Sequence, residues 1–104
     1  MEDSGFEILK EKSGKIIKLI IKGRISATYA DQFQKKLDEA IQEGPSTIIL
    51  NMLQVIYLSS SGLKVILKGY KDAEKAGVPL GIEEPSENVL NILKMTALER
   101  LLMM

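Results

Sequence analysis

Three consecutive serines, Ser59, Ser60 and Ser61, are the residues of this sequence best suited to carry chemistry. Gly62 follows them and opens a segment whose apolar spacing predicts a helix. A serine hydroxyl at such a junction can cap the helix by accepting a hydrogen bond from an open amide of the first turn. It can also act as a nucleophile or carry a phosphate, because an anion there faces open amides and the positive end of the helix dipole. Capping explains one serine better than it explains three.

Catalysis by this chain is disfavoured by the residues that it lacks. It has no histidine, which is the usual general base and the commonest zinc ligand. It has no cysteine, so it can form neither a thiolate nucleophile nor a disulfide. Ser61 and Lys64 match the S-x-x-K pattern of penicillin-recognising enzymes, but the partner motifs S-D-N and K-T-G are missing. The phosphate-binding motifs G-x-x-x-x-G-K-[ST] and G-x-G-x-x-G are also absent. The sequence favours a binding or signalling protein.

The composition predicts one globular domain over residues 1–104. Hydrophobic residues make up 45% of the chain and charged residues 27%. Lysine and arginine total 14, as do aspartate and glutamate, so the chain has no overall field that would attract nucleic acid or an anionic membrane. No apolar run approaches the roughly 18 residues that span a bilayer, and the acidic N-terminus does not resemble a signal peptide.

The first half of the chain predicts a hairpin followed by a helix. Two strands, Phe6 to Glu11 and Lys15 to Lys22, are expected to meet at a turn formed by Ser13 and Gly14. A capping box at Thr28 and Asp31 is expected to start the helix, and Gly44 with Pro45 to end it. The apolar residues at helical spacing are Ala30, Phe33, Leu37, Ala40 and Ile41.

The middle of the chain predicts a buried strand, Ser46 to Met52, then a loop over residues 53–58 and the helix that follows the serines. Gly77 is expected to end that helix. Its buried stripe is predicted to hold Leu63, Ile66, Leu67, Tyr70 and Ala73. Its solvated stripe is predicted to hold Lys64, Lys68, Lys71 and Lys75. Gly62 is less favourable than alanine inside a helix, which indicates close approach by another molecule.

The last third predicts a strand and two short helices. Pro79 suits a strand at the edge of a sheet. Ser86 is expected to cap the third helix, and Thr96 with Glu99 to form a capping box for the fourth. The alternation of strands and helices predicts a mixed, mostly parallel sheet of four to five strands with an N-terminal hairpin and about four helices. The serines follow a strand of this sheet, where functional loops are expected.

Nearly the whole chain, and above all the stretch from residue 47 to residue 102, resembles the bacterial anti-sigma factor antagonists of the STAS domain family. The similarity includes an early G-R-I before a helix, the amphipathic helix LKVILKGYK and the closing L-x-x-T-x-L-x-x-L-L. The D-S-S-G-L motif of the family falls on SSSGL, residues 59–63. The serine that is phosphorylated in the family is then Ser60.

This resemblance implies a phosphorylation switch. The unphosphorylated protein would bind an anti-sigma factor that is itself a serine kinase, and so free a sigma factor for transcription. The kinase would phosphorylate Ser60 and release the antagonist, and a metal-dependent serine phosphatase would reset it. The resemblance implies a cytoplasmic monomer or weak dimer that is not an enzyme, needs no cofactor and binds neither nucleic acid nor membrane. The residues expected to contact the partner are Ser26, Ser59, Ser60, Ser61, Gly62 and Lys64.

Three positions that are acidic in the family are neutral here, namely Ser26, Asn51 and Ser59. A kinase that docks on those charges would bind this chain weakly. Two other functions therefore stay open. The domain could serve as a signalling scaffold or a transporter-associated subunit, or it could bind a nucleotide or a lipid. Retention of Ser60 favours the switch, whereas a saturable thermal shift with a nucleotide would favour ligand binding.

Overall fold

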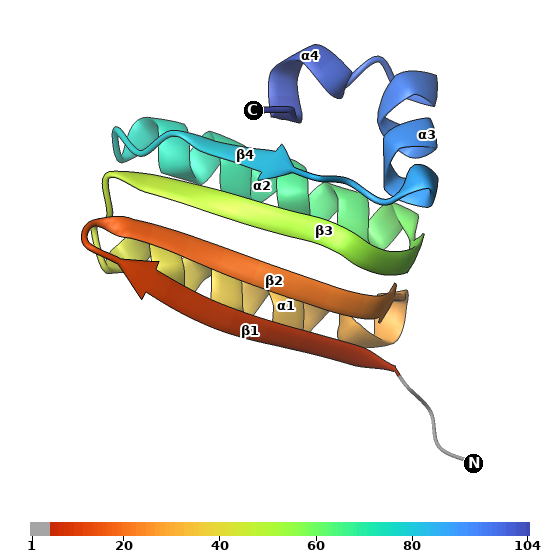
Figure 1. Cartoon of the computed structure of the whole chain (residues 1–104), viewed down its shortest axis with the longest axis horizontal. Coiled ribbons are helices and arrows are strands. Elements are labelled where there is room, and N and C mark those ends of the chain that lie inside the picture. Colours follow the sequence, from red (N-terminus) through yellow and green to blue (C-terminus); the bar gives the residue numbers. More distant parts are fainter. Residues whose placement is uncertain (1–4) are drawn as a thin grey trace.

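The computed structural model describes residues 5–104, which form one sheet and four helices (Figure 1). The strands are β1 (Phe6–Ser13), β2 (Ile16–Ile25), β3 (Thr47–Leu58) and β4 (Leu80–Glu83). The helices are α1 (Ala27–Gln42), α2 (Ser60–Lys75), α3 (Glu87–Met95) and α4 (Glu99–Leu102). The predicted order of the elements is confirmed.

The described strands lie in the order β1-β2-β3-β4. β1 and β2 are antiparallel and the other neighbours are parallel, which confirms a mostly parallel sheet with an N-terminal hairpin. β4 lies at the edge, as Pro79 predicted. The hairpin turn is formed by Gly14 and Lys15, one residue later than predicted, because Ser13 already pairs with Ile16. Gly14 has a φ of +61°, a conformation that glycine adopts without strain.

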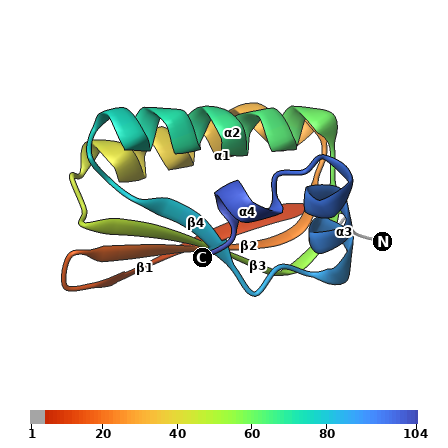
Figure 2. The same ribbon diagram turned by 90° about the horizontal axis from the view of Figure 1, so that it is seen from above.

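One face of the sheet is covered by α1 and α2, which lie side by side (Figure 2). The core lies between these two layers. Successive residues of a strand point to opposite faces, so β2 alternates between buried and partly exposed residues. Buried residues of this layer include Ile17, Leu19, Ile21, Phe33, Leu37, Ile48, Leu50 and Ile66.

The stripe that α2 buries differs from the predicted one. Ile66 and Ala73 are buried as expected, but Val65 and Gly69 are buried with them. The predicted Leu63, Leu67 and Tyr70 are only partly buried at the margin of the core. The reason is close contact between helices. A Cβ at Gly69 would lie 2.2 Å from Cδ2 of Leu37, so α2 turns its glycine side toward α1.

β3 continues through residues 53–58, where a loop was predicted. That prediction is wrong because β2 runs on beside it, pairing Gly23 with Val55 and Ile25 with Leu58. The pairing absorbs two register shifts, one between Ile20 and Lys22 and one just after Gly23. As a result, β3 leads directly to Ser59.

The ends of the helices correct two capping predictions. α1 begins after Ser26, which has the extended backbone of an N-cap, so Thr28 lies inside the first turn. Thr96 ends α3 instead of starting α4, because its hydroxyl donates to the carbonyl of Ile92 at 2.7 Å.

The other predicted helix ends are confirmed. Ser86 caps α3 by accepting from the amide of Val89 at 3.2 Å. Gly44 and Gly77 follow α1 and α2 with φ values of +69° and +77°.

Candidate functional site

The candidate site lies where β2 and β3 end side by side and α1 and α2 begin (Figure 1). Ile25 and Leu58 are the last residues of these strands and pair with each other. Ser26 and Ser59 follow them as the N-caps of the two helices. The amide of Ser59 donates to the carbonyl of Ile25 at 2.9 Å, which fixes one helix start against the other strand. The structure thus brings Ser26 to the same end of the sheet as the serine cluster.

The three consecutive serines have three different environments. The Oγ of Ser59 accepts a hydrogen bond from the amide of Gly62 at 3.0 Å, so Ser59 is the capping serine. Ser60 is the first residue of α2 and is exposed, whereas Ser61 is partly buried. The amides of Ser60 and Ser61 lie in the first turn, where no carbonyl of the same helix can reach them. Ser60 is therefore the serine of the cluster that is presented to solvent.

Gly62 is buried and fits the first turn of α2 onto the strand ends. A Cβ at this position would lie 2.7 Å from Cγ2 of Ile25 and 2.9 Å from Cδ1 of Leu58. Real side chains do not approach so closely. The close approach comes from residues of this chain, and the expectation that another molecule makes it is wrong. Gly62 positions Ser60 without being exposed beside it.

The other predicted contact residues differ in how they face solvent. Ser26 is partly buried and its side chain makes no capping hydrogen bond, while its carbonyl accepts from the amide of Tyr29 at 3.1 Å. Lys64 is exposed, four residues after Ser60 and therefore one turn further along the same side of α2.

Asn51 does not join this cluster. It lies seven residues before Leu58 on β3, about 23 Å away along an extended strand. Its Nδ2 donates to Oε2 of Glu83 at 3.3 Å, and its Oδ1 accepts from the amide of Leu53 at 3.2 Å. An amide suits this place better than a carboxylate, because the neighbouring strand supplies an acid.

The second half of β3, which leads to the site, carries exposed apolar side chains that the sequence did not reveal. Leu53, Ile56 and Tyr57 of β3 are 55%, 56% and 43% exposed. They were missed because this segment was predicted to be a loop. Ile56 and Tyr57 stand three and two residues before Ser59, and this nearness in the sequence was the available signal.

The two helix starts that form the site carry no acidic side chains in their first turns. By contrast, α3 begins with Glu87 and α4 with Glu99. The pKa shifts belong to surface ion pairs elsewhere. Hydrogen bonds from Lys10 and Lys12 lower the pKa of Glu43, and one from Lys18 lowers that of Glu83.

Two arrangements would indicate catalysis or metal binding in the described residues, a Ser61–Lys64 pair and a cluster of acidic side chains. Within residues 5–104, no hydrogen bond joins Ser61 to Lys64, so the S-x-x-K pattern has no structural counterpart. Across the same residues, no group of three or more acidic side chains is placed to hold a metal ion. No helix in the described part of the chain is long and apolar enough to cross a membrane.

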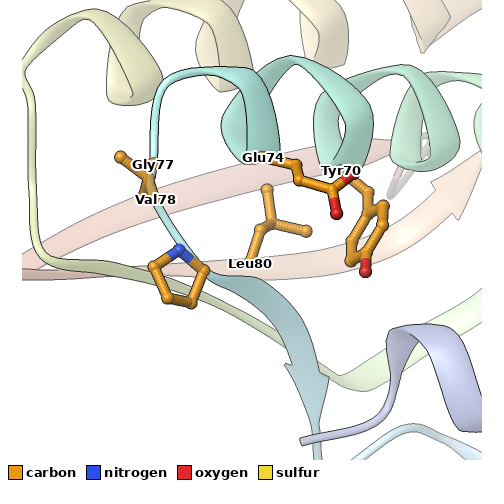
Figure 3. Close-up of a pocket in the computed structure, with 6 residues that line it drawn as sticks. Tyr70, Glu74, Gly77, Val78 and Leu80 are labelled. Atoms are coloured by element: carbon orange, nitrogen blue, oxygen red, sulfur yellow. The ribbon is translucent and has the colours of Figure 1, made fainter.

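A hollow of about 280 Å³ lies at the opposite end of α2 (Figure 3). Tyr70 and Glu74 face it from the helix, Val78 from the connection that follows α2, and Leu80 from the start of β4. It shares no residue with the serine cluster, so a ligand there would not contact Ser60.

Comparisons with known proteins identify a family and similar folds for this chain. A family model described as the STAS domain matches residues 7–104. The anti-sigma factor antagonist SpoIIAA in its unphosphorylated form is similar, with a TM-score of 0.80, 21% identity and coverage of 93% of this chain and 86% of SpoIIAA. No curated protein sequence matched the chain.

Two further structures show the same fold. The phosphorylated form of SpoIIAA, a Bacillus cell fate determinant, has a TM-score of 0.75, 20% identity and coverage of 93% and 89%. An anti-sigma factor antagonist from Mycobacterium paratuberculosis has a TM-score of 0.79, 17% identity and coverage of 94% and 83%.

Proposed function

The chain belongs to the STAS domain family, and from that premise we propose that it is an anti-sigma factor antagonist switched by phosphorylation of Ser60. In its unphosphorylated form it binds an anti-sigma factor that is a serine kinase, and a sigma factor is released. The kinase phosphorylates Ser60, and a metal-dependent serine phosphatase restores the binding form. We further propose that residues 1–104 form a single STAS domain that acts in the cytoplasm by binding and not by catalysis.

The observation that carries this proposal is the division of roles in the serine cluster. Ser59 caps α2 and Gly62 packs on the strand ends, while Ser60 is exposed between them. Ser59 and Gly62 thus fix the position of Ser60, which faces solvent. A phosphate on Ser60 would meet the open amides of the first turn and the positive end of the helix dipole. It would add about −1.5 to −2 charges without breaking a contact of the core.

Ser26, Ser61 and Lys64 complete the proposed contact surface around Ser60. Ser26 comes from the start of α1 and the other two from α2, so a partner would contact both helix starts at once. Two of the positions that carry acids in the family, Ser26 and Ser59, are neutral at this end of the sheet. This favours, as a second candidate, a STAS domain that binds another partner without a phosphorylation switch.

The test is whether the charge on Ser60 controls binding. We expect Ser60→Asp to fold normally and to lose the anti-sigma factor kinase from the same host, because the added charge alters the contact surface and not the core. We expect Ser60→Ala to bind it constitutively, since it cannot be phosphorylated. Titration calorimetry with the purified kinase measures both, and peptide-mapped mass spectrometry of protein from the host locates the phosphate.

The matched control is Ser46→Ala, because Ser46 is an exposed serine just before the start of β3, at the other end of that strand; this variant should still be phosphorylated on Ser60. Equal binding by both Ser60 variants would contradict the switch. A phosphate confined to Ser59 or Ser61 would show that the site is misassigned. Phosphate-free protein under all growth conditions would favour the second candidate.

A further inference from the structure

Four exposed lysines form one face of α2, which we call the lysine face: Lys64, Lys68, Lys71 and Lys75. Their spacings of four, three and four residues place them on one side of the helix. They extend over about 16 Å, starting one turn after Ser60.

The charge of the lysine face is only partly balanced. Lys68 donates to Oδ2 of Asp72 at 2.7 Å, and this hydrogen bond raises the pKa of Lys68. Within residues 5–104, the other three lysines form no ion pair. Lys64 stands at the start of the second turn of α2, one turn after Ser60.

The lysine face is also hollowed. A depression of about 630 Å³ extends over it, with the partly buried Leu67 among its lining residues. Asp72 and Glu74 line it too, so four positive and two negative side chains surround one apolar side chain. A basic rim around an apolar residue is complementary to an acidic, amphipathic segment.

We propose that the lysine face binds an acidic amphipathic segment of a partner protein, with an apolar side chain against Leu67 and carboxylates against the lysines. The partner segment is expected to be negatively charged because no acid at the two helix starts would repel it. The first turns of α1 and α2 contain no acid, and Ser26 and Ser59 are neutral. The inference rests on the proposed function only in taking Ser60 as the place that the partner must approach. A phosphate on Ser60 would repel the same acidic segment, so phosphorylation would weaken binding of the partner.

The probe for this binding is a designed 15-residue helical peptide with glutamates spaced four, three and four residues apart and leucines between them. It is titrated into the whole ¹⁵N-labelled chain and followed by amide chemical shifts. We expect saturable shifts that cluster on residues 63–75. Because the contact is ionic, we expect affinity to fall several-fold between about 50 and 200 mM NaCl. A peptide with lysines in place of the glutamates should not bind.

Two double variants with the same change of net charge make the test specific. Lys64→Glu/Lys71→Glu should weaken the acidic peptide at least about tenfold. Lys15→Glu/Lys36→Glu should leave its affinity within about twofold, because Lys15 lies in the hairpin turn and Lys36 on the β1 side of α1. Equal losses in both double variants, equal binding of the basic peptide, or shifts outside α2 would overturn the proposal.

Ser60→Asp separates this inference from the proposed function. It should weaken the acidic peptide about two- to fivefold through repulsion one turn from Lys64. No effect of Ser60→Asp on the peptide would overturn the repulsive role of the phosphate. If Ser60 is phosphorylated in the host but the purified, unphosphorylated chain does not bind the acidic peptide, this inference is overturned and the switch is left intact.

Discussion

Ser59 and Ser60 are neighbours in the sequence but differ in their hydrogen bonds and in their exposure to solvent. The Ser59 hydroxyl satisfies the amide of Gly62, and its own amide is bonded to Ile25. Ser60 is exposed and contributes to the surface. At the scale of the residue, the site is therefore an exposed hydroxyl held by a capped and closely packed helix start.

This difference predicts unequal effects on stability. Ser59→Ala should lower the free energy of unfolding by about 1 kcal/mol, because it removes the N-cap of α2. Ser60→Ala should change it by no more than about 0.5 kcal/mol, as expected of an exposed position. Urea denaturation of the two variants beside the parent protein measures both changes. A larger loss for Ser60→Ala than for Ser59→Ala would mean that the cap is misassigned.

At the scale of the element, α1 and α2 make close contact at Gly69 of α2, which has no side chain. Gly69 of α2 allows Leu37 of α1 to pack directly on its backbone. The two helices start from the same end of the sheet, so this contact also fixes the relative position of Ser26 and Ser59.

A double-mutant cycle tests this contact. Gly69→Ala should destabilise the fold by about 1–3 kcal/mol, because its Cβ forces Leu37 to move. Leu37→Ala alone should cost about 2–5 kcal/mol, as expected of a fully buried leucine. In the double variant the new methyl group should occupy part of the vacated space, so the losses should be less than additive by about 0.5–3 kcal/mol. Strict additivity in thermal or urea unfolding would contradict the contact.

Hydrophobic patterns, together with capping and turn residues, predicted the order of the strands and helices. The order of the elements, the parallel strands and the serines at a helix start were all available from the sequence. The end of β3 was not, because residues 53–58 expose apolar side chains and are held in the sheet by pairing with β2. The role of Gly62 was also missed, since its contact with Ile25 depends on two segments far apart in the sequence.

At the scale of the whole molecule, ion pairs join segments that are distant in the chain. Glu43, which ends α1, accepts from Lys10 and Lys12 of β1. Glu83 of β4 pairs with Lys18 of β2 at 2.9 Å. Lys18 alternates with the buried Ile17 and Leu19, so it lies on the face of the sheet that α1 and α2 leave uncovered (Figure 2). These three ion pairs link the outer strands β1 and β4 to the end of α1 and to β2.

These pairs predict a loss of stability in acid. The lysine hydrogen bonds lower the pKa of Glu43 and Glu83 below the ordinary value of 4.5. A lowered pKa in the folded state adds stability above the unfolded-state pKa, and this part is lost as pH falls through the folded-state pKa. We expect the urea midpoint of the parent protein to fall more steeply below about pH 4.5 than that of Glu43→Gln/Glu83→Gln. Parallel pH profiles would show that the pairs do not contribute.

The hydrogen bond from Ser59 to Ile25 has a consequence for any enzyme that modifies Ser60. The target hydroxyl belongs to a conformation that exists only when β2 and β3 are paired, because Ile25 is separated from Ser59 by the whole of α1 and β3. A short peptide with the same local sequence would have the residues of the motif but not their arrangement. An enzyme that recognises this arrangement would therefore act on the folded chain and would pass over the unfolded chain, even though the latter displays every serine.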